Sequence, residues 1–372
     1  MTKPSESTSS TILTRRLRPI VGKATLTLFT FILLVAFLSP FAYMFATATK
    51  DREQISQVRP LWPAKEETFT YTGETKTVTF GDEEITLESG AEYDIYFVPT
   101  EDGGERRLAM VAPRRQVSYF IDPSNPEAGV FEWEGVWRKL DRAWTFEIQL
   151  DNFVRAWNEL NFPLIVRNTL IIAVGGMIGT LISSILVAYG FSRFRIPGKS
   201  IFFIILVGTI ILPRQVTLIP TYALFARIGW VGTFLPLIVP HFFANAYNVF
   251  LLRQYFMTIP KEMDEAAMID GASPMRTLLS IILPQAMPAV VTVGLFHFVF
   301  AWNDYFTPLI YLSAKRDLQP ISVAIQLYNA RYAFEVNMIQ ATALLGLAVP
   351  LIIFFFAQRV FMRGVVTTGV EK

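Results

Sequence analysis

The chain has no cysteine and only two histidines, His241 and His297, among its 372 residues. It can therefore form neither a disulfide nor a thiolate metal site, and two histidines cannot make a histidine-rich one. Charged residues are also scarce, at 17% against about 25% in an average soluble domain. The formal net charge of +2 is too small to indicate nucleic-acid binding. We therefore expect no metal centre and no nucleic-acid partner.

Hydrophobic residues are abundant instead, at 52% of the chain. A helix rises about 1.5 Å per residue, so roughly 20 apolar residues cross the 30 Å hydrocarbon core of a bilayer. The first apolar run is too long for the core of a cleaved signal peptide, so we expect an uncleaved anchor. The sequence predicts an all-α polytopic membrane protein with six transmembrane helices, at Val21–Ala46, Leu164–Phe191, Ile201–Phe225, Phe234–Leu252, Ala286–Ile310 and Met338–Phe361.

The distribution of lysine and arginine predicts the orientation of these helices. An even number of crossings places both termini on one side, and positive charge gathers on the cytoplasmic side of a membrane. We therefore expect cytoplasmic tails at 1–20 and 362–372, although Lys315, Arg316 and Arg331 fall in a predicted outer loop. The positive charges that carry this prediction are Arg15, Arg16, Arg18, Lys23, Arg193, Arg195, Lys199, Arg253, Lys261, Arg359, Arg363 and Lys372.

A soluble block interrupts the apolar pattern after the first predicted helix. Residues 47–160 should be extracytoplasmic, and within them about 64–144 look like an inserted β-rich domain. Short alternating runs separated by glycine, proline and aspartate clusters are typical of antiparallel strands. Trp133, Trp137 and Trp144 either form its core or pack on its outer surface. The predicted strands are Thr77–Phe80, Tyr93–Val98, Arg107–Ala112 and Val117–Ile121.

Prolines interrupt the other apolar runs, at 213, 220, 236, 240 and 288. Membrane helices tolerate proline only where neighbours or water satisfy the freed carbonyls, so we expect kinked helices around a cavity. The segment Pro220–Gly229 should leave the membrane as a short interfacial helix.

One polar segment, Glu265–Pro284, lies between two apolar runs and within the predicted cytoplasmic loop 253–285. Pro260 and Ser273–Pro274 are helix-start signals and Gly271 is a stop signal, which predicts two short helices joined by a glycine turn. Helices this short are marginal alone, so we expect them to pack against a soluble partner.

These residues resemble, position by position, the EAA signature of the permease subunits of bacterial ATP-binding-cassette importers. The resemblance covers 12–58 and 145–372, assigns 161–361 to a permease core of five helices, and is closest to the smaller maltose-type permease. It implies the fold of a type I importer permease. It also implies that the partner ATPase docks on Met263, Glu265, Ala266, Ala267, Asp270, Gly271, Ile281, Leu283 and Pro284. The Glu265 carboxylate would cap or pair with groups near the turn, while Met263, Ala266 and Ala267 would enter a groove of the ATPase.

The resemblance further implies an assembly in the bacterial inner membrane that imports a sugar, with this chain as half of the pore. Its partners would be a second homologous permease, two ATP-binding-cassette ATPases, an extracytoplasmic solute-binding protein and the lipid bilayer. ATP and Mg²⁺ would bind the ATPases, and this chain would hold no cofactor and no catalytic residue. Gly198-Lys199-Ser200 does not form a phosphate-binding loop, because Arg193 stands where the first glycine is needed.

Polar residues inside the apolar runs are candidates for the transport pathway, since such groups seldom face lipid. His241, Asn245 and Asn248 recur at helical spacing and should share one face of a helix. Their alternative role is hydrogen bonding between helices. A second set of candidates places His297 and Asp304 on one face of a helix, with Trp302 and Asn303 beside them. The alternative role for Asp304 is that of a structural cap.

Two other classes of protein remain open from the residues alone. An ion-coupled secondary transporter would need membrane-buried carboxylates and internal repeats, and a membrane enzyme would need acid and base pairs, none of which is evident. The inserted domain either contacts the binding protein or partner permease, or is a spacer.

Overall fold

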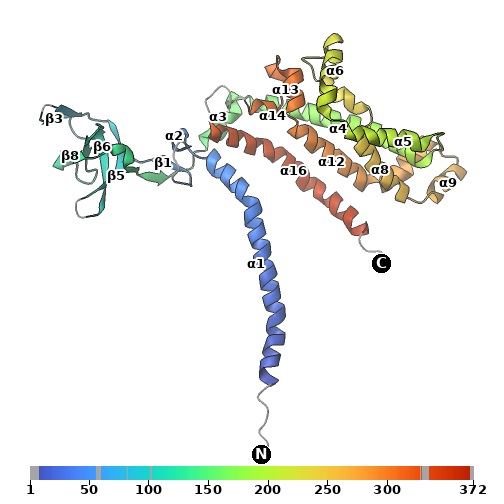
Figure 1. Ribbon diagram of the computed structural model, residues 1–372, viewed down its shortest axis with the longest axis horizontal. Coiled ribbons are helices and arrows are strands. Elements are labelled where there is room, and N and C mark those ends of the chain that lie inside the picture. The colour runs from blue at the N-terminus through green and yellow to red at the C-terminus, as the bar shows by residue number, and fades with distance from the viewer. Residues whose placement is uncertain are drawn as a thin grey trace, which may run out of the picture. The chain divides into compact units, whose positions relative to one another are not determined.

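The computed structural model describes residues 8–55, 60–81, 83–100, 103–326, 328 and 335–368. The chain divides into two compact units, one ending at Asn152 and the other beginning at Phe153, and each is described by itself (Figure 1). The outer ends of both predicted tails and Arg331 lie outside the described residues.

The first unit begins with the long helix α1 (Thr8–Ala48), which contains the apolar stretch Gly22–Ala48. This confirms the first predicted apolar helix. Its large apolar side chains are exposed from Leu26 to Phe45, as expected of a helix whose surroundings are lipid. The short helix α2 (Arg52–Ile55) follows.

Among the described residues, ten strands follow α2, and all of their pairings are antiparallel. The four strands that the sequence predicts are confirmed as β3, β5, β6 and β7. The 3₁₀ turns η1 (Pro126–Ala128) and η2 (Trp137–Lys139) lie among the strands. The strands are β1 (Ala64–Glu66), β2 (Thr68–Thr70), β3 (Lys76–Phe80), β4 (Glu83–Leu87), β5 (Glu92–Pro99), β6 (Glu105–Ala112), β7 (Val117–Ile121), β8 (Val130–Glu134), β9 (Asp141–Arg142) and β10 (Trp144–Phe146).

The main sheet has the order β2-β5-β6-β7-β8, with β9 also paired to β5, while β3-β4 and β1-β10 form separate ribbons. Successive side chains on a strand point to opposite faces, and both faces of this sheet are packed. On one face Ile95 joins a core with Leu87, and on the other Tyr96 joins a core with Leu108 and Phe120. The β-rich unit is therefore stabilised by apolar packing on two sides.

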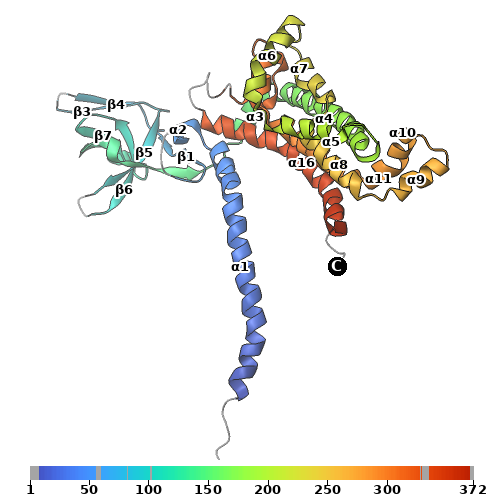
Figure 2. The same ribbon diagram turned by 45° about the vertical axis from the view of Figure 1, so that its right-hand side comes forward.

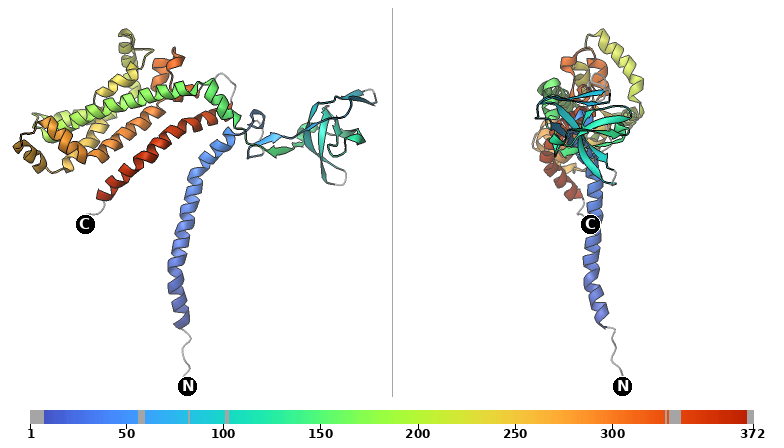
Figure 3. Two further views of the ribbon diagram at one scale, coloured as in Figure 1. Left: turned by 180° about the vertical axis from the view of Figure 1, so that it is seen from behind. Right: turned by 90° about the vertical axis from the view of Figure 1, so that its left-hand side faces the viewer.

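The second unit is helical. Figures 1 and 3 show α12 running between α4 and α16, and α8 also packs on α4. Its elements are α3 (Asp151–Glu159), which starts two residues before the unit boundary, α4 (Phe162–Arg193), α5 (Lys199–Gly208), η3 (Thr209–Ile211), α6 (Arg214–Arg227), α7 (Leu235–Ile238), η4 (Val239–Phe242), α8 (Ala246–Thr258), α9 (Glu262–Ile269), α10 (Pro274–Thr277), the π-helical turn η5 (Leu278–Ile282), α11 (Leu283–Gln285), α12 (Met287–Asn303), α13 (Phe306–Leu312), η6 (Arg316–Leu318), α14 (Ile321–Ala324) and α16 (Val336–Thr368).

Among the described residues, four helices are long and apolar enough to cross a membrane, and up to six cross if each of two bent pairs counts as one span. The predicted helices Leu164–Phe191 and Met338–Phe361 are confirmed as parts of α4 and α16.

The predicted span Ile201–Phe225 is bent, as the proline at 213 leads us to expect. The chain bends by 97° between Lys199–Ile211 and Val216–Arg227. Pro213 adopts an extended conformation at the start of α6, and it cannot donate the hydrogen bond that would continue the preceding helix. The turn therefore comes before Pro220, which lies inside α6 and does not begin a new helix.

Two further predicted helices are also interrupted. In Phe234–Leu252 the chain is extended at Phe243 and Asn245, so α8 begins only at Ala246. In Ala286–Ile310 the helix α12 ends at Asn303 and α13 starts anew. Apolar runs show only where lipid or core can lie, so they do not reveal these local breaks.

Candidate functional site

The polar segment Pro260–Gln285, here called the elbow, lies at one end of the helical unit (Figure 2). Helix α9 ends at Ile269 with Asp270 as its C-cap, and Gly271 follows in the left-handed region at φ 75°. The Gly271 amide donates to the carbonyl of Met268 at 3.0 Å, and the Ala272 amide donates to that of Ala267 at 2.9 Å. These bonds form a Schellman motif, which satisfies the last carbonyls of a helix and favours glycine. The predicted glycine turn between two helices is confirmed.

The second arm of the elbow starts where the sequence predicts. The Ser273 side chain accepts a hydrogen bond from the Arg276 amide, and Pro274 occupies the first turn of α10. The π-helical turn η5 continues it, with Leu278 and Ile282 buried among residues of α4, α8 and α12. The segment Pro274–Gln285 then meets α12 at an angle of 82°.

The elbow is attached to the end of α4 by an ion pair that the sequence does not reveal. Asp264 Oδ2 lies 3.0 Å from Arg193 Nε, and the two side chains are only 11% and 7% exposed. Arg193 also donates to the Ile259 carbonyl at 2.9 Å, and the Tyr189 hydroxyl donates to the Pro274 carbonyl at 3.2 Å. Both arms of the elbow are thus held against α4.

The expected pairing of Glu265 near the turn is wrong, because Asp264 makes the ion pair instead. Glu265 is exposed, and among the described residues its carboxylate has no hydrogen-bond or ion-pair partner. The neighbouring carboxylates differ because only Asp264 lies on the face of α9 that is turned toward the helical unit.

Besides Met263, four large apolar side chains of the elbow are exposed, and we call these four the elbow patch: Met268, Ile269, Met275 and Leu279. Ile269 is 87% exposed although it is fully apolar. Contiguous apolar groups on a surface mark interaction sites more often than isolated ones do. The motif did not single out these residues, and only their burial state identifies them.

The docking residues named from the sequence fall into three groups by exposure. Met263, Glu265, Ala266, Asp270, Gly271 and Pro284 are exposed, whereas Ile281 and Leu283 are half-buried. Ala267 is only 4% exposed. The expectation that Ala267 enters a groove of another protein is therefore wrong, because its side chain packs within the chain.

The two histidines lie together between α4, η4 and α12. The rings of His241 and His297 are 4.4 Å apart and nearly perpendicular, and Thr180 Oγ1 lies 3.1 Å from His297 Nδ1. The sequence placed these histidines in separate sets. Gly176 of α4 makes room for them, since a Cβ at Gly176 would lie 2.8 Å from His297 Nε2 and 3.1 Å from His241 Cδ2.

Replacing Gly176 with alanine should therefore lower the stability of the helical unit. Overpacking a close contact costs about 1–3 kcal/mol. The matched control is Gly190→Ala in the same helix, where a Cβ would meet nothing within 4 Å. Thermal unfolding of the purified chain should show a lower melting temperature for the first variant only, and equal melting temperatures would contradict the tight contact.

His241, Asn245 and Asn248 do not share one helical face, so that prediction is wrong. Asn245 is the N-cap of α8, and its side-chain oxygen accepts from the amides of Tyr247 at 3.0 Å and Asn248 at 3.3 Å. Asn248 is buried within α8, whereas Asn245 is exposed. Three aromatic side chains beside Asn245 are also exposed: Phe242, Phe243 and Tyr247.

The residues of the second set of pathway candidates also lie in different surroundings. Trp302 is 4% exposed and stacks on Phe298, so its contacts are those of a core residue. Asn303 is exposed and donates to the Val299 carbonyl at 2.8 Å. Asp304 follows the last residue of α12, and its Oδ1 accepts from the Thr307 amide, which confirms the capping alternative. His297 and Asp304 therefore do not lie on one face of a helix.

A cavity of about 260 Å³ lies between α6, η4 and α13. His241 and Asp304 line it together with threonines from two helices, Thr217, Thr221 and Thr307. The structure thus gathers two of the predicted pathway residues at one hollow, whose remaining lining is largely apolar. Its volume is slightly below that of typical small-ligand pockets, about 300–1,000 Å³.

Comparisons with known proteins agree with this architecture. Residues 162–367 match the family model described as binding-protein-dependent transport system inner membrane component. The osmoprotective compounds uptake permease protein GgtD of Synechocystis is 29% identical over 71% of this chain and 89% of that protein. The sn-glycerol-3-phosphate transport system permease protein UgpE of Pectobacterium atrosepticum is 34% identical over 56% of this chain and 74% of that protein.

A crystal structure of a bacterial ABC transporter involved in the import of the acidic polysaccharide alginate contains a chain of similar fold. Its TM-score is 0.58 at 19% identity, covering 99% of this chain and 100% of that one. At this identity the likeness concerns the fold.

The family model covers more than half of the chain, so the chain belongs to the binding-protein-dependent transport system inner membrane components. It is the permease component of an ATP-binding-cassette importer and a transport component rather than an enzyme. Membership in this family also decides against an ion-coupled secondary transporter and a membrane enzyme.

Proposed function

We propose that the chain crosses the inner membrane six times, with both termini and the elbow in the cytoplasm and the β-rich unit outside. The apolar helices and the clustering of lysine and arginine support this orientation. The partners would be a second permease, two ATP-binding-cassette ATPases that hold ATP and Mg²⁺, and an extracytoplasmic solute-binding protein.

The elbow would be the docking site for an ATPase subunit. The observation that carries this proposal is the elbow patch, with Ile269 87% exposed at the tip of α9. The Arg193–Asp264 ion pair joins α9 to the long helix α4, so a displacement of the elbow would move α4 as a rigid body. Closure of the ATPases on ATP would thereby turn the pore outward.

The imported solute would be a sugar, and a di- or oligosaccharide fits the family resemblance best. Polyhydroxylated solutes need hydrogen-bonding groups next to flat apolar faces. The exposed Asn245 offers hydrogen-bonding groups, and its exposed neighbours offer flat apolar faces: Phe242, Phe243 and Tyr247. We assign the pathway to this group and to His241 with Asp304 in the 260 Å³ cavity.

Substitutions of Asn245 should separate its capping role from its transport role. Serine retains an N-cap, whereas leucine removes it at a cost of about 0.5–2 kcal/mol. If Asn245 lines the pathway, Asn245→Ser should change the range of sugars taken up while the melting temperature stays near that of the parent. Unaltered uptake of every sugar by Asn245→Ser would assign Asn245 to capping alone.

Reconstitution tests the function itself. Proteoliposomes that contain the complete importer should accumulate a radiolabelled oligosaccharide when ATP and Mg²⁺ are supplied on the side of the elbow. A proton or sodium gradient without ATP should give no uptake. Accumulation driven by the gradient alone would refute the proposal.

A further inference from the structure

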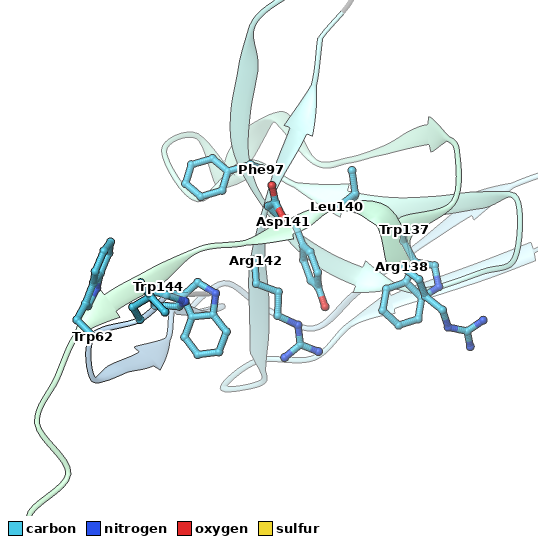
Figure 4. Close-up of a pocket in the computed structure, with 11 residues that line it drawn as sticks. Trp62, Phe97, Trp137, Arg138, Leu140, Asp141, Arg142 and Trp144 are labelled. Atoms are coloured by element: carbon cyan, nitrogen blue, oxygen red, sulfur yellow. The ribbon is translucent and has the colours of Figure 1, made fainter. Parts of the chain in front are cut away.

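A cavity of about 910 Å³ lies within the first unit, and none of the docking or pathway candidates lines it. It is bounded by the segment 60–62, strand β5 and the stretch 137–144. Figure 4 shows Trp62 at one end, Arg142 and Trp144 in the middle, and Trp137 with Arg138 at the other end. The cavity is therefore an elongated hollow with three tryptophans distributed along it.

The three tryptophans that line the cavity are not fully buried in the core of the β-rich unit. Trp62 is 57% exposed, and Trp144 is partly exposed in β10. The ring centroids of Trp137 and Tyr96 are 6.4 Å apart and the two rings are nearly perpendicular, and Trp137 also lines the cavity. Trp133, by contrast, packs against Phe120 and does not line it. The cavity is therefore lined along its length by partly exposed tryptophan rings, which are flat and apolar.

The polar groups of the cavity are held in fixed positions. Arg142 forms an ion pair with Glu66, lies 3.8 Å from Asp94 and stands over the Tyr96 ring at 5.4 Å. Arg138 lies over the Trp137 ring at 5.1 Å. A guanidinium carries five N–H donors, so each arginine has donors left for a ligand.

The Tyr96 hydroxyl is a second indication of a ligand. Tyr96 is only 2% exposed, and no described group satisfies its hydroxyl at full hydrogen-bond geometry, with the Arg142 guanidinium as its polar neighbour. Burial raises the pKa of Tyr96, while Arg142 acts in the opposite direction, so the hydroxyl keeps its proton at neutral pH and can donate. A buried polar group without a partner is rare in folded proteins and calls for one.

We propose that this cavity is a binding site for a neutral oligosaccharide. Its volume of about 910 Å³ lies within the range of ligand pockets, about 300–1,000 Å³. Sugar rings present apolar C–H faces that stack on tryptophan and hydroxyls that bond to arginine, aspartate and tyrosine. Arg142 is already paired with Glu66 and lies near Asp94, and the two other charged lining residues, Arg138 and Asp141, have opposite signs, so the charges do not favour an anionic ligand.

Other occupants fit the cavity less well. A protein partner would bury about 800 Å² on each side, mostly over flat surfaces, and this site is concave. A lipid tail would have to lie against charged groups such as Asp141 and Arg142, which costs free energy.

Calorimetric titration of the full-length chain in detergent micelles tests the proposal with two probes, a neutral α-1,4-glucan pentasaccharide and a uronic-acid pentasaccharide. The neutral probe should bind more tightly, and Trp144→Ala should weaken it at least about tenfold. Arg138→Ala, at an exposed position, should weaken it without altering the melting temperature. Phe131→Ala, an exposed aromatic of β8 outside the cavity, is the control and should bind like the parent.

Three results would overturn the proposal: no heat with the neutral probe, equal affinity in the Trp144→Ala and Arg138→Ala variants, or tighter binding of the uronate. If detergent or a protein occupied the cavity in place of the sugar, the neutral probe would give no heat. Transport is not needed for this binding, because the titration contains no ATPase and no solute-binding protein. Failure of binding and failure of import are therefore separate results.

Discussion

Replacing Gly271 with glutamate should abolish uptake while the chain remains folded in the membrane. Gly271 is exposed, and a Cβ there would meet nothing within 4 Å, so the substitution causes no clash. The left-handed backbone at φ 75° adds a cost of roughly 1–2 kcal/mol for a residue with a side chain. This strain is small compared with the loss expected at an interface.

The expected loss comes from the partner. An unpaired carboxylate at the centre of a docking surface costs about 2 kcal/mol or more, which is more than tenfold in affinity. The matched control is Gly271→Asn, because asparagine tolerates the left-handed conformation and adds no charge. Uptake should be retained largely with asparagine and lost with glutamate. Equal uptake by both variants would show that Gly271 does not face the ATPase.

Breaking the ion pair between Arg193 and Asp264 should produce the largest loss of stability. Removing one partner of a buried pair leaves the other charge uncompensated and costs about 3–5 kcal/mol. Asp264→Ala should therefore lower the melting temperature of the purified chain strongly. The neighbouring Glu265→Ala is the control, and its exposed position should limit the effect to about 0.5 kcal/mol.

A double substitution distinguishes the pair from the individual residues. In Arg193→Met with Asp264→Leu, apolar side chains fill the same space without a buried charge, and such replacements are often neutral or stabilising. The double variant should recover most of the stability that Asp264→Ala loses. If its melting temperature falls as far as that of the single variant, the ion pair is not what holds α9 to α4.

The sequence predicts those features that depend on neighbouring residues. Pro274, Ser273 and Gly271 define the two arms of the elbow because capping and left-handed turns are local chemistry. Alternation alone predicts β3, β5, β6 and β7. The bend at Pro213 follows from the proline itself, whereas the extended residues before α8 at Asn245 escape prediction because an apolar run reads the same whether its helix is straight or broken.

Contacts between distant segments are the part that the sequence does not reveal. Nothing near Arg193 indicates that Asp264 is its partner, and His241 and His297 meet only because Gly176 leaves space between them. Likewise, no local pattern separates buried Ala267 from exposed Ala266 and Ile269. The motif indicates the family, whereas only the burial of each side chain shows which surface of the elbow is available for docking.

The most direct test of coupling through the elbow uses the absence of cysteine from the chain. A single Ile269→Cys variant, in cells that express the complete importer, can be treated with a bifunctional thiol reagent. The product should contain an ATPase subunit, and its yield should change when ATP is present. The buried position Ala267→Cys should give little product. Absence of any ATPase from the Ile269→Cys product, or labelling of Ile269→Cys by a reagent confined outside the cell, would contradict the account.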